Sequence, residues 1–454
     1  METLNNIVLT IQNYMSNYVL IIALLGAGLW FSFRLGFIQV RGFGEGMRRT
    51  FGGLFSKKGE AGADGMSSFQ ALATAIAAQV GTGNIAGAAT ALAIGGPGAI
   101  FWMWIAAFLG MATIYAEAIM AQKYKTVGAD GQVTGGPVYY IRAAFKGTFG
   151  KVLAGIFAIL ITLALGFMGN AVQSNSIAAS FHTAFGIPQW IMGLVVAVIA
   201  IFVFMGGMKR IAKVTETIVP FMAALYIIGS LIVIIYNYKN IPYAFASIFI
   251  GAFSPSSVVG GAAGATVKLA LTKGVARGLF SNEAGMGSTP HAHAVAKVNH
   301  PVEQGYVAMA GVFIDTFIVL NLTALVILTT KSIPTGKTGA ELSQYAFSTL
   351  YGKGGNIFIA ICMFFFAFST IIGWYFFGQA NVKYLFGPKA VKIYSVLAAV
   401  CVFLGSLAEV DLVWNMADCF NSLMVIPNIL ALFALSKVIS QVHKDYFTNF
   451  NKAK

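Results

Sequence analysis

Long apolar stretches separated by short polar segments fill almost the whole chain of 454 residues. A helix that crosses a membrane needs about 20 apolar residues, and eleven stretches reach roughly that length. No stretch remains for a soluble domain, so the pattern predicts an all-α integral membrane protein with one transmembrane domain over residues 1–454. The predicted spans are Tyr18 to Phe37, Met66 to Ile94, Gly98 to Lys123, Val152 to Ser180, Gln189 to Met208, Val214 to Tyr236, Ala263 to Ser288, Gly305 to Leu328, Asn356 to Tyr384, Val391 to Leu407 and Leu412 to Leu435.

Two predicted spans contain polar, glycine-rich interruptions near their centres. The span from Met66 carries Gly81-Thr82-Gly83-Asn84, and the span from Ala263 carries Lys273-Gly274-Val275-Ala276-Arg277-Gly278. In hydrocarbon every backbone polar group needs a partner, so unwound backbone survives only where it faces protein, water or a ligand. We therefore predict a binding site whose candidate contacts are Gln79, Gly81, Thr82, Gly83 and Asn84 from the first interruption and Gly274, Val275 and Ala276 from the second.

The positions of the interruptions also suggest a repeat. Without the extra first span at residues 18–37, ten spans divide into five at residues 66–236 and five at residues 263–435. Each group begins with an interrupted helix, and an odd number of spans per group places the two groups in opposite orientations. Such inverted repeats with discontinuous helices are typical of secondary transporters, which bind their substrates at the interrupted helices.

Each interruption has an alternative interpretation. Small residues such as Gly83 and Gly87 also allow close helix packing without any ligand. Lys273 and Arg277 lie one turn apart at the centre of a predicted span, where charge is costly and usually has a counter-charge. Their candidate partners are the intramembrane carboxylates Glu117, Glu283 and Asp315, and the sequence leaves structural and gating roles equally open.

The charge balance changes the prediction of topology. The chain is 58% hydrophobic and 10% charged, with a formal net charge of +14 and a pI near 9.6. In a soluble protein this charge would suggest nucleic acid, but here it predicts orientation in the lipid bilayer, because Lys and Arg favour cytoplasmic loops. Only Lys239, Lys331, Lys337 and Lys353 fall in the loops of one side, which predicts an external N-terminus and a cytoplasmic C-terminus.

Other chemistry-bearing residues give weak signals. The segment Met1 to Asn17 has no Lys or Arg, so we expect the first span to be retained rather than cleaved as a signal peptide. Cys362, Cys401 and Cys419 show no metal or disulfide spacing, and we expect no metal at His291, His293 and His300. We expect no enzyme, because the sequence offers no catalytic constellation beyond Glu283 with His291 and His293, and no filter motif of a channel.

Two motifs connect the chain with a known family. The run from Gly95 to Gly110, with sequence GGPGAIFWMWIAAFLG, resembles the signature of the alanine or glycine:cation symporter family. The run from Ser281 to Ser288, with sequence SNEAGMGS, is also similar to this family. The resemblance extends over essentially the whole chain. It implies the LeuT-type inverted-repeat fold and sodium-coupled uptake of a small neutral amino acid, alanine or glycine, across the cell membrane.

The resemblance also implies roles for individual residues. Residues 80–84 are similar to the first broken helix of the wider superfamily, where freed amides hold the substrate carboxylate. The superfamily places a sodium ion between this helix and two hydroxyls, here Ser369 and Thr370. The implied sodium ligands are the carbonyls of Ala77, Val80 and Phe366 and the hydroxyls of Ser369 and Thr370. The alternative is that both hydroxyls bond only to their own helix.

Three further points stay open at this stage. Gln79 replaces a small residue of the superfamily pattern, which puts a second sodium site in doubt. Phe167 and Asn170 lie one turn apart in the fourth span and are predicted to face the substrate, although Asn170 is equally suited to an interhelical hydrogen bond. Proton coupling through Glu117 or Asp315 is the alternative to sodium coupling. The oligomeric state is not predictable.

Overall fold

Helices make up nearly all of the structure, as the apolar pattern predicts. The computed structural model describes residues 14–54, 65–254 and 266–450. The first helices are η1 (Met15–Val19), α2 (Leu20–Arg34), α3 (Ile38–Arg41) and α4 (Phe43–Leu54). They are followed by α5 (Ser68–Gln79), η2 (Gly83–Gly87), α6 (Ala88–Gly95), α7 (Gly98–Lys123), α8 (Pro137–Ala144), α9 (Gly147–Ile161), η3 (Thr162–Gly169), α10 (Asn170–Phe185), α11 (Gln189–Phe204), α12 (Gly207–Tyr236), η4 (Tyr238–Asn240) and α13 (Ile241–Phe253).

The second half of the chain has the same character. Its elements are α14 (Val267–Asn282), α15 (Pro290–Ala294), α16 (Pro301–Phe313), η6 (Ile314–Leu320), α17 (Asn321–Thr329), η7 (Ile333–Thr335), α18 (Gly339–Tyr351), α19 (Lys353–Phe386), α20 (Ala390–Leu407), α21 (Val410–Ala434), α22 (Ser436–Asp445) and η8 (Tyr446–Phe450). The strands β1 (Thr126–Val127) and β2 (Val133–Thr134) form one short antiparallel hairpin after α7.

Seven helical stretches among the described residues are long and apolar enough to cross a membrane. They are Gly98–Lys123, Gly147–Phe185, Gly207–Tyr236, Pro301–Thr329, Lys353–Phe386, Ala390–Leu407 and Val413–Ala434. Three shorter apolar helices, Leu20–Arg34, Gly83–Gly95 and Gln189–Phe204, fall within other predicted spans. The chain is therefore a multi-pass membrane protein, and the count of eleven spans stays a prediction.

Some sequence predictions fall outside the described residues. These are most of the segment Met1 to Asn17, the first residues of the predicted span Ala263 to Ser288, and the C-terminal Lys454.

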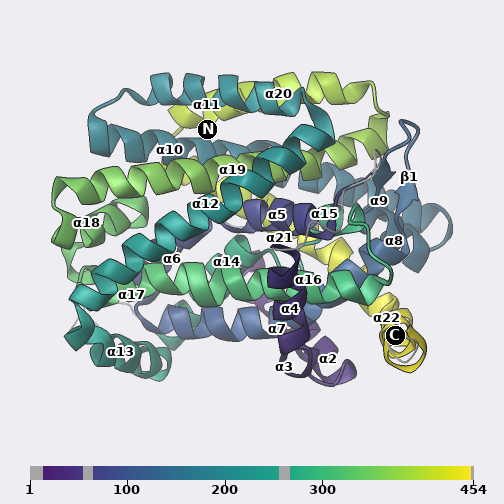
Figure 1. The fold of residues 1–454 in the computed structure, drawn as a ribbon, viewed down its shortest axis with the longest axis horizontal. Coiled ribbons are helices and arrows are strands. Elements are labelled where there is room, and N and C mark those ends of the chain that lie inside the picture. Colours follow the sequence, from purple (N-terminus) through teal and green to yellow (C-terminus); the bar gives the residue numbers. More distant parts are fainter. Residues whose placement is uncertain (1–13, 55–64, 255–265, 451–454) are drawn as a thin grey trace.

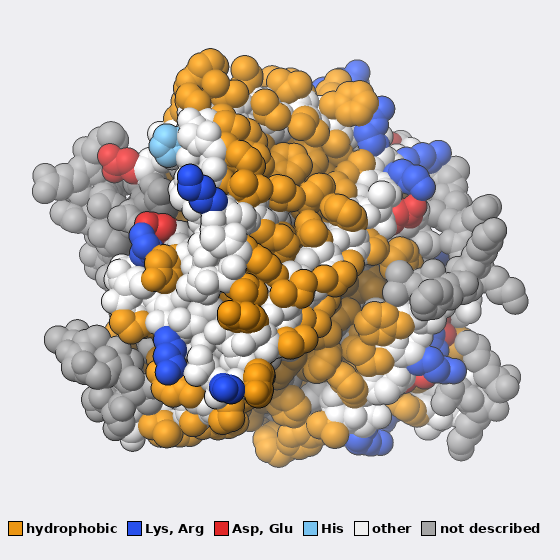
Figure 2. Space-filling view, turned by 60° about the vertical axis from the view of Figure 1, so that its left-hand side comes forward, with side chains coloured by type: hydrophobic (Ala, Val, Ile, Leu, Met, Phe, Trp, Pro, Cys, Tyr) orange, Lys and Arg blue, Asp and Glu red, His pale blue; other side chains and the backbone are white. Residues whose placement is uncertain are grey.

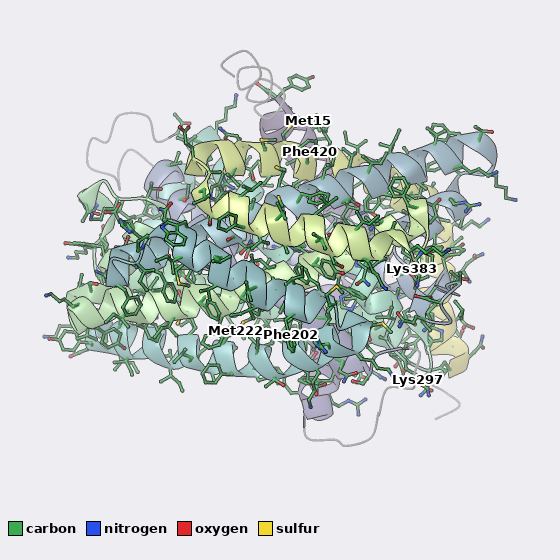
Figure 3. All side chains as sticks on the ribbon, turned by 90° about the horizontal axis from the view of Figure 1, so that it is seen from above. Met15, Phe202, Met222, Lys297, Lys383 and Phe420 are labelled. Atoms are coloured by element: carbon green, nitrogen blue, oxygen red, sulfur yellow. The ribbon has the colours of Figure 1, made fainter. Side chains whose placement is uncertain are left out.

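The long helices run side by side along the longest axis of the molecule (Figure 1). α13 and α18 lie at one end of this bundle, whereas α8, β1, α22 and the C-terminus lie at the other. Lys297 and Lys383 both lie at the latter end (Figure 3), as expected for residues predicted on the same side of the membrane. Figure 2 shows a broad band of hydrophobic side chains across one face, with Lys and Arg side chains at its edges.

The helices with predicted interruptions lie inside the bundle. α5 packs against α12, α16 and α19, and α14 packs against α6 and α7. Most side chains of α5 are therefore buried, and many of them are alanine, which lets neighbouring helices approach closely. The bundle thus surrounds the first interruption with protein on every side.

Candidate functional site

The first interruption lies at the place that the sequence predicts. α5 begins with a capping box, in which Ser67 and Gln70 each accept a hydrogen bond from the other's backbone N–H. The helix ends at Gln79, because Val80 leaves the helical conformation (φ −85°, ψ 87°), and helical structure resumes in η2 at Gly83. The residues of this gap are buried, so the unwound backbone lies inside the protein, as a membrane requires.

The five oxygen atoms predicted to bind sodium meet between α5 and α19. Thr370 Oγ1 lies 2.8 Å from Ala77 O, 3.0 Å from Phe366 O and 3.5 Å from Val80 O. Ser369 Oγ lies 2.9 Å from Phe366 O and 3.3 Å from Ala77 O. All five residues are buried. The cluster consists of neutral carbonyl and hydroxyl oxygens, the ligand type that a hard cation prefers.

The same geometry tests the alternative for the two hydroxyls. Each donates to Phe366 O on its own helix, which is the back-bonding that the alternative predicts. Each hydroxyl also reaches Ala77 O on α5, across the helix interface. Back-bonding alone therefore does not account for the positions of Ser369 and Thr370.

The freed N–H groups of the first interruption donate to side-chain amides. Gly81 N–H donates to Asn84 Oδ1 (3.0 Å), and Thr82 N–H donates to Gln173 Oε1 (3.1 Å). A Cβ atom at Gly81 would lie 2.3 Å from Thr370 Oγ1, so this position requires glycine. Our sequence analysis missed Gln173, although a buried Gln among Asn and Ser residues in an apolar span is a detectable signal.

The second interruption is not at Lys273 to Gly278, and that prediction is wrong. α14 runs unbroken from Val267 to Asn282. The chain leaves the helix at Glu283 (φ 58°) and turns through Gly285 (φ 87°) and Gly287 (φ 79°) before α15. Two glycines in the left-handed region allow this sharp change of direction.

Gly274, Val275 and Ala276 accordingly face helix neighbours rather than the first interruption. A Cβ atom at Gly274 would lie 2.5 Å from Ala99 O on α7. Val275 and Ala276 border small gaps against α2. The physical reason is that small residues at this position permit close helix packing, the same interpretation that we weighed for Gly83 and Gly87.

The two interruptions contact each other. Gln79 Nε2 at the end of α5 donates to Asn282 O at the end of α14 (2.7 Å). A Cβ atom at Gly83 would lie only 3.1 Å from Ser281 Cα, so the backbones approach closely there. Both helix ends therefore border one small region in the middle of the bundle.

Asp315 adds a buried carboxylate to this region. It accepts hydrogen bonds from Asn84 Nδ2 (2.7 Å), Ser281 Oγ (2.9 Å) and Thr316 Oγ1 (2.8 Å). These donors are neutral, and no cation lies among them. A carboxylate with neutral partners is a candidate for binding a proton or a cation during transport.

Glu117 of α7 binds the second interruption. Its carboxylate accepts hydrogen bonds from Gly285 N–H (3.0 Å), Gly287 N–H (2.9 Å) and Asn428 Nδ2 (2.6 Å). Glu283, the first residue of the interruption, accepts from Ser288 Oγ and Trp374 Nε1. Fixed protein groups thus bind the polar groups of this interruption.

The predicted ion-pair partners of Lys273 and Arg277 are also wrong. Arg277 pairs with Asp418 on α21, with 3.0 Å between Nη2 and Oδ2, and lies over the Trp414 ring at 4.6 Å. None of Glu117, Glu283 and Asp315 forms an ion pair with Arg277 or Lys273 in the described part of the chain. The sequence could not reveal Asp418 as the partner, since nothing in it fixes which residues of α14 and α21 face each other.

The two candidates in the fourth span differ in position. The Phe167 ring packs against Tyr394 on α20 (5.5 Å between centroids). Asn170 Nδ2 donates to Gly166 O of its own helix, and its buried Oδ1 has no partner within the described residues. η3 is π-helical, which changes the spacing of side chains around the helix, and a shared face of Phe167 and Asn170 toward the substrate stays a prediction.

Aromatic side chains that our sequence analysis did not select border the region instead. The Phe280 ring lies 5.6 Å from the Trp374 ring and 4.9 Å from the Trp414 ring. Phe280 Cδ1 would lie 3.3 Å from a Cβ atom at Gly83. Aromatic residues are frequent in apolar spans, so nothing in the sequence distinguishes these three from packing residues.

Comparisons with known proteins identify the family of the chain. The family model described as the sodium:alanine symporter family matches residues 1–454. The chain is 42% identical to the sodium/alanine symporter AgcS of Methanococcus maripaludis, over 97% of this chain and 97% of that protein. It is 41% identical to the amino-acid carrier protein AlsT of Bacillus subtilis (98% of this chain, 93% of that one) and 41% identical to the probable sodium/glutamine symporter GlnT of Bacillus subtilis (98% and 91%).

Solved structures share the fold. A Na+-coupled sialic acid symporter in a substrate-bound, outward-open state aligns with a TM-score of 0.57 at 14% identity, over 93% of this chain and 86% of that chain. A manganese transporter of Eremococcus coleocola aligns with a TM-score of 0.52 at 14% identity, over 82% and 78%. At this identity the likeness concerns the fold alone, the LeuT-type fold that the sequence resemblance implies. The protein is a transporter rather than an enzyme, and the chain belongs to the sodium:alanine symporter family.

Proposed function

We propose that the protein couples the inward flow of sodium ions to the uptake of a small neutral amino acid, alanine or glycine, across the cell membrane. The observation that supports this most is the buried cluster of neutral oxygens formed by Ala77, Val80, Phe366, Ser369 and Thr370. The names of the family and of the relative AgcS include sodium and alanine, which supports the same coupling and substrate class.

The substrate site of this proposal is the first interruption with its neighbours. The amides of Gly81, Thr82 and Gly83 are suited to the carboxylate, because freed N–H groups at a helix start attract anions. Gln79 Oε1 and Asn170 Oδ1 are buried acceptors without a partner in the described residues, and they suit the ammonium group. Asn84 then links this site to Asp315.

The size of the substrate follows from the walls of the site. Gly83 lies close to Ser281 and Phe280, so we expect the site to accept only a small side chain. We expect glycine and alanine to compete with labelled alanine, serine and valine to compete weakly, and leucine not to compete. One extra methylene changes binding by only about 1 to 3 kcal/mol, so the discrimination against valine should be partial.

Transport in this proposal proceeds by alternating access. Residues 66–236 and 263–435 form two inverted repeats of five spans each, with an extra span at residues 18–37 and eleven spans in total. The N-terminus is external and the C-terminus is cytoplasmic, as the distribution of Lys and Arg predicts. In intact cells a membrane-impermeant thiol reagent should label a Lys239→Cys variant, and labelling only after permeabilisation would contradict this topology.

A specific observation favours proton coupling as the second candidate. Asp315 is buried, lies beside the first interruption through Asn84, and has only neutral partners. Glu117 is less suited to this role, because backbone N–H groups and Asn428 bind its carboxylate. A proton-coupled protein would carry its proton on Asp315.

Uptake of labelled alanine into proteoliposomes distinguishes the candidates. Sodium coupling predicts accumulation with an inward sodium gradient at equal pH on both sides, and none with an inward proton gradient in sodium-free buffer. The Asp315→Asn variant is the matched control, since it keeps the size of the side chain and removes the titratable group. Accumulation driven by protons alone, and lost in Asp315→Asn, would instead establish proton coupling.

A further inference from the structure

A cavity of about 550 Å³ lies between α6, α10, α14, α18 and α21. It reaches the surface at the end of the molecule where α18 lies (Figure 1), because the exposed residues Ile94 and Glu341 are part of its wall. Lys273 and Arg277 of α14 also line it. The positively charged helix face that the sequence places in a membrane span therefore faces an open cavity rather than lipid.

The cavity leads to the candidate substrate site. Arg277 and Trp414 belong to its wall, and the Trp414 ring contacts Phe280, which lies beside Gly83. Ala86 of η2 also lines the cavity, within the same short helix that begins at Gly83. A solute in this cavity is thus separated from the first interruption by the side chains of Trp414 and Phe280.

Among the charged residues of the cavity wall, Lys273 has no direct ion pair in the described part of the chain, and Asp418 is the carboxylate that acts on it electrostatically. Arg277 pairs with Asp418, and Glu341 pairs with Lys337 at its edge. Lys273 makes no hydrogen bond or ion pair within the described residues, and it is half-buried against Gly95 of α6. An ammonium group at this depth in a membrane protein is costly, unless water or an anionic ligand solvates it.

We propose that this cavity is an outer binding site for the carboxylate of an amino acid, which Lys273 holds before the solute passes Trp414 and Phe280. This inference rests on the transport function proposed above, and it adds a site that is separate from the first interruption. The remaining wall suits a zwitterion. Asn175, Ser176, Ser180 and Thr183 of α10 offer neutral polar groups, and Glu341 offers a carboxylate for the ammonium group.

An experiment on the purified protein tests this directly. An Ala340→Cys variant introduces a thiol in the cavity wall. The rate at which this thiol reacts is measured with a negatively charged and with a positively charged methanethiosulfonate reagent. Cys362 and Cys419 are buried and Cys401 is half-buried, so the unmodified protein gives the background rate. Lys273→Gln in this variant should lower the ratio of anionic to cationic labelling rates by about 5- to 10-fold.

Two matched variants make the result interpretable. Lys273→Arg keeps the charge and should keep the ratio, and it also reports whether a change at this position disturbs the fold. Lys353→Gln removes an exposed charge that does not line the cavity and should leave the ratio unchanged. An unchanged ratio in Lys273→Gln would overturn the proposal.

Protection by the solute identifies the ligand. In sodium-free buffer, excess alanine should slow the labelling of the Ala340→Cys variant, and Lys273→Gln should abolish this protection. Alanine amide, which lacks the carboxylate, should not protect. Equal protection by chloride would show a general anion site and would overturn the assignment to an amino acid, as would the absence of protection by alanine.

Labelling of the Ala340→Cys variant also separates this proposal from the proposed function. Thr370→Val alters the sodium cluster and should leave the sodium-free protection at position 340 intact. If wild-type proteoliposomes show no sodium-driven uptake while alanine still protects, the proposed coupling fails and the outer site stands. If uptake is sodium-driven and alanine does not protect, the outer site fails and the coupling stands.

Discussion

At the first interruption the freed N–H groups donate to neutral amide oxygens, those of Asn84 and Gln173. At the second, the N–H groups of Gly285 and Gly287 donate to the carboxylate of Glu117. Hydrogen bonds to an ionised acceptor are about twice as strong as neutral ones. The N–H groups of Gly285 and Gly287 are therefore bound by one carboxylate of α7, whereas those of the first interruption have only neutral amide partners.

Unpartnered buried atoms are more numerous at the first interruption, although Thr289 Oγ1 beside the second also has no partner in the described residues. Gln79 Oε1, Thr82 Oγ1 and Gln173 Nε2 are buried, belong to the first interruption or contact it, and have no partner in the described residues. At the second interruption, both carboxylate oxygens of Glu117 and both of Glu283 accept hydrogen bonds. The difference teaches that two interrupted helices of one chain can be stabilised by different groups, one by a carboxylate and the other by neutral amides.

The largest expected effect concerns the second interruption. Glu117→Leu would leave the N–H groups of Gly285 and Gly287 buried without an acceptor, which costs about 1 to 3 kcal/mol each. We expect a loss of roughly 2 to 6 kcal/mol in stability, seen as a lower unfolding temperature in detergent. Glu117→Gln keeps one acceptor oxygen and should lose less stability. The sodium dependence of its alanine uptake should be unchanged. Equal stability of Glu117→Leu and wild type would remove the contrast between the two interruptions.

A smaller effect is expected from a methyl group at the first interruption. Gly81→Ala places a Cβ atom 2.3 Å from Thr370 Oγ1, and overpacking of this kind costs about 1 to 3 kcal/mol. Sodium-driven alanine uptake should fall on the order of 100-fold. Gly278→Ala is the control, because its nearest neighbour, Met103, would be 3.5 Å away, and it should transport normally. Normal uptake by Gly81→Ala would exclude a tight site there.

The smallest effect concerns a single oxygen of the cluster. Thr370→Val keeps the shape of the side chain and removes its hydroxyl, so the sodium concentration for half-maximal uptake should rise by about tenfold, or ~1.4 kcal/mol. Thr370→Ser retains the hydroxyl and should stay within about threefold of wild type. A sodium dependence that is identical in all three proteins would place the coupling ion elsewhere.

The sequence predicted the first interruption because its polar residues have no packing explanation. Gln79, Thr82 and Asn84 stand in an otherwise apolar span, and the structure brings them to the break. The adjacent hydroxyls Ser369 and Thr370 were predicted only through the resemblance to the superfamily, and they lie opposite the carbonyl of Ala77. The all-α class also follows from the apolar pattern alone.

The second interruption was misplaced for a physical reason. Gly274 and Gly278 suit both a broken helix and close packing, and only the position of α7 decides between these. The true break at Glu283 lies within the run SNEAGMGS, whose two positive-φ glycines cannot be told from ordinary ones by sequence. Contacts between distant helices, such as Arg277 with Asp418 and Thr82 with Gln173, depend on packing that no local pattern encodes.

The most direct test of the account is the binding of alanine to the purified protein as a function of sodium concentration. If sodium binds beside the first interruption, it should tighten alanine binding, and alanine should tighten sodium binding by the same factor, because coupling between two sites is reciprocal. Thr370→Val should shift this sodium dependence to higher concentration without changing the alanine affinity at saturating sodium. An alanine affinity that is independent of sodium in the wild-type protein would contradict the central claim.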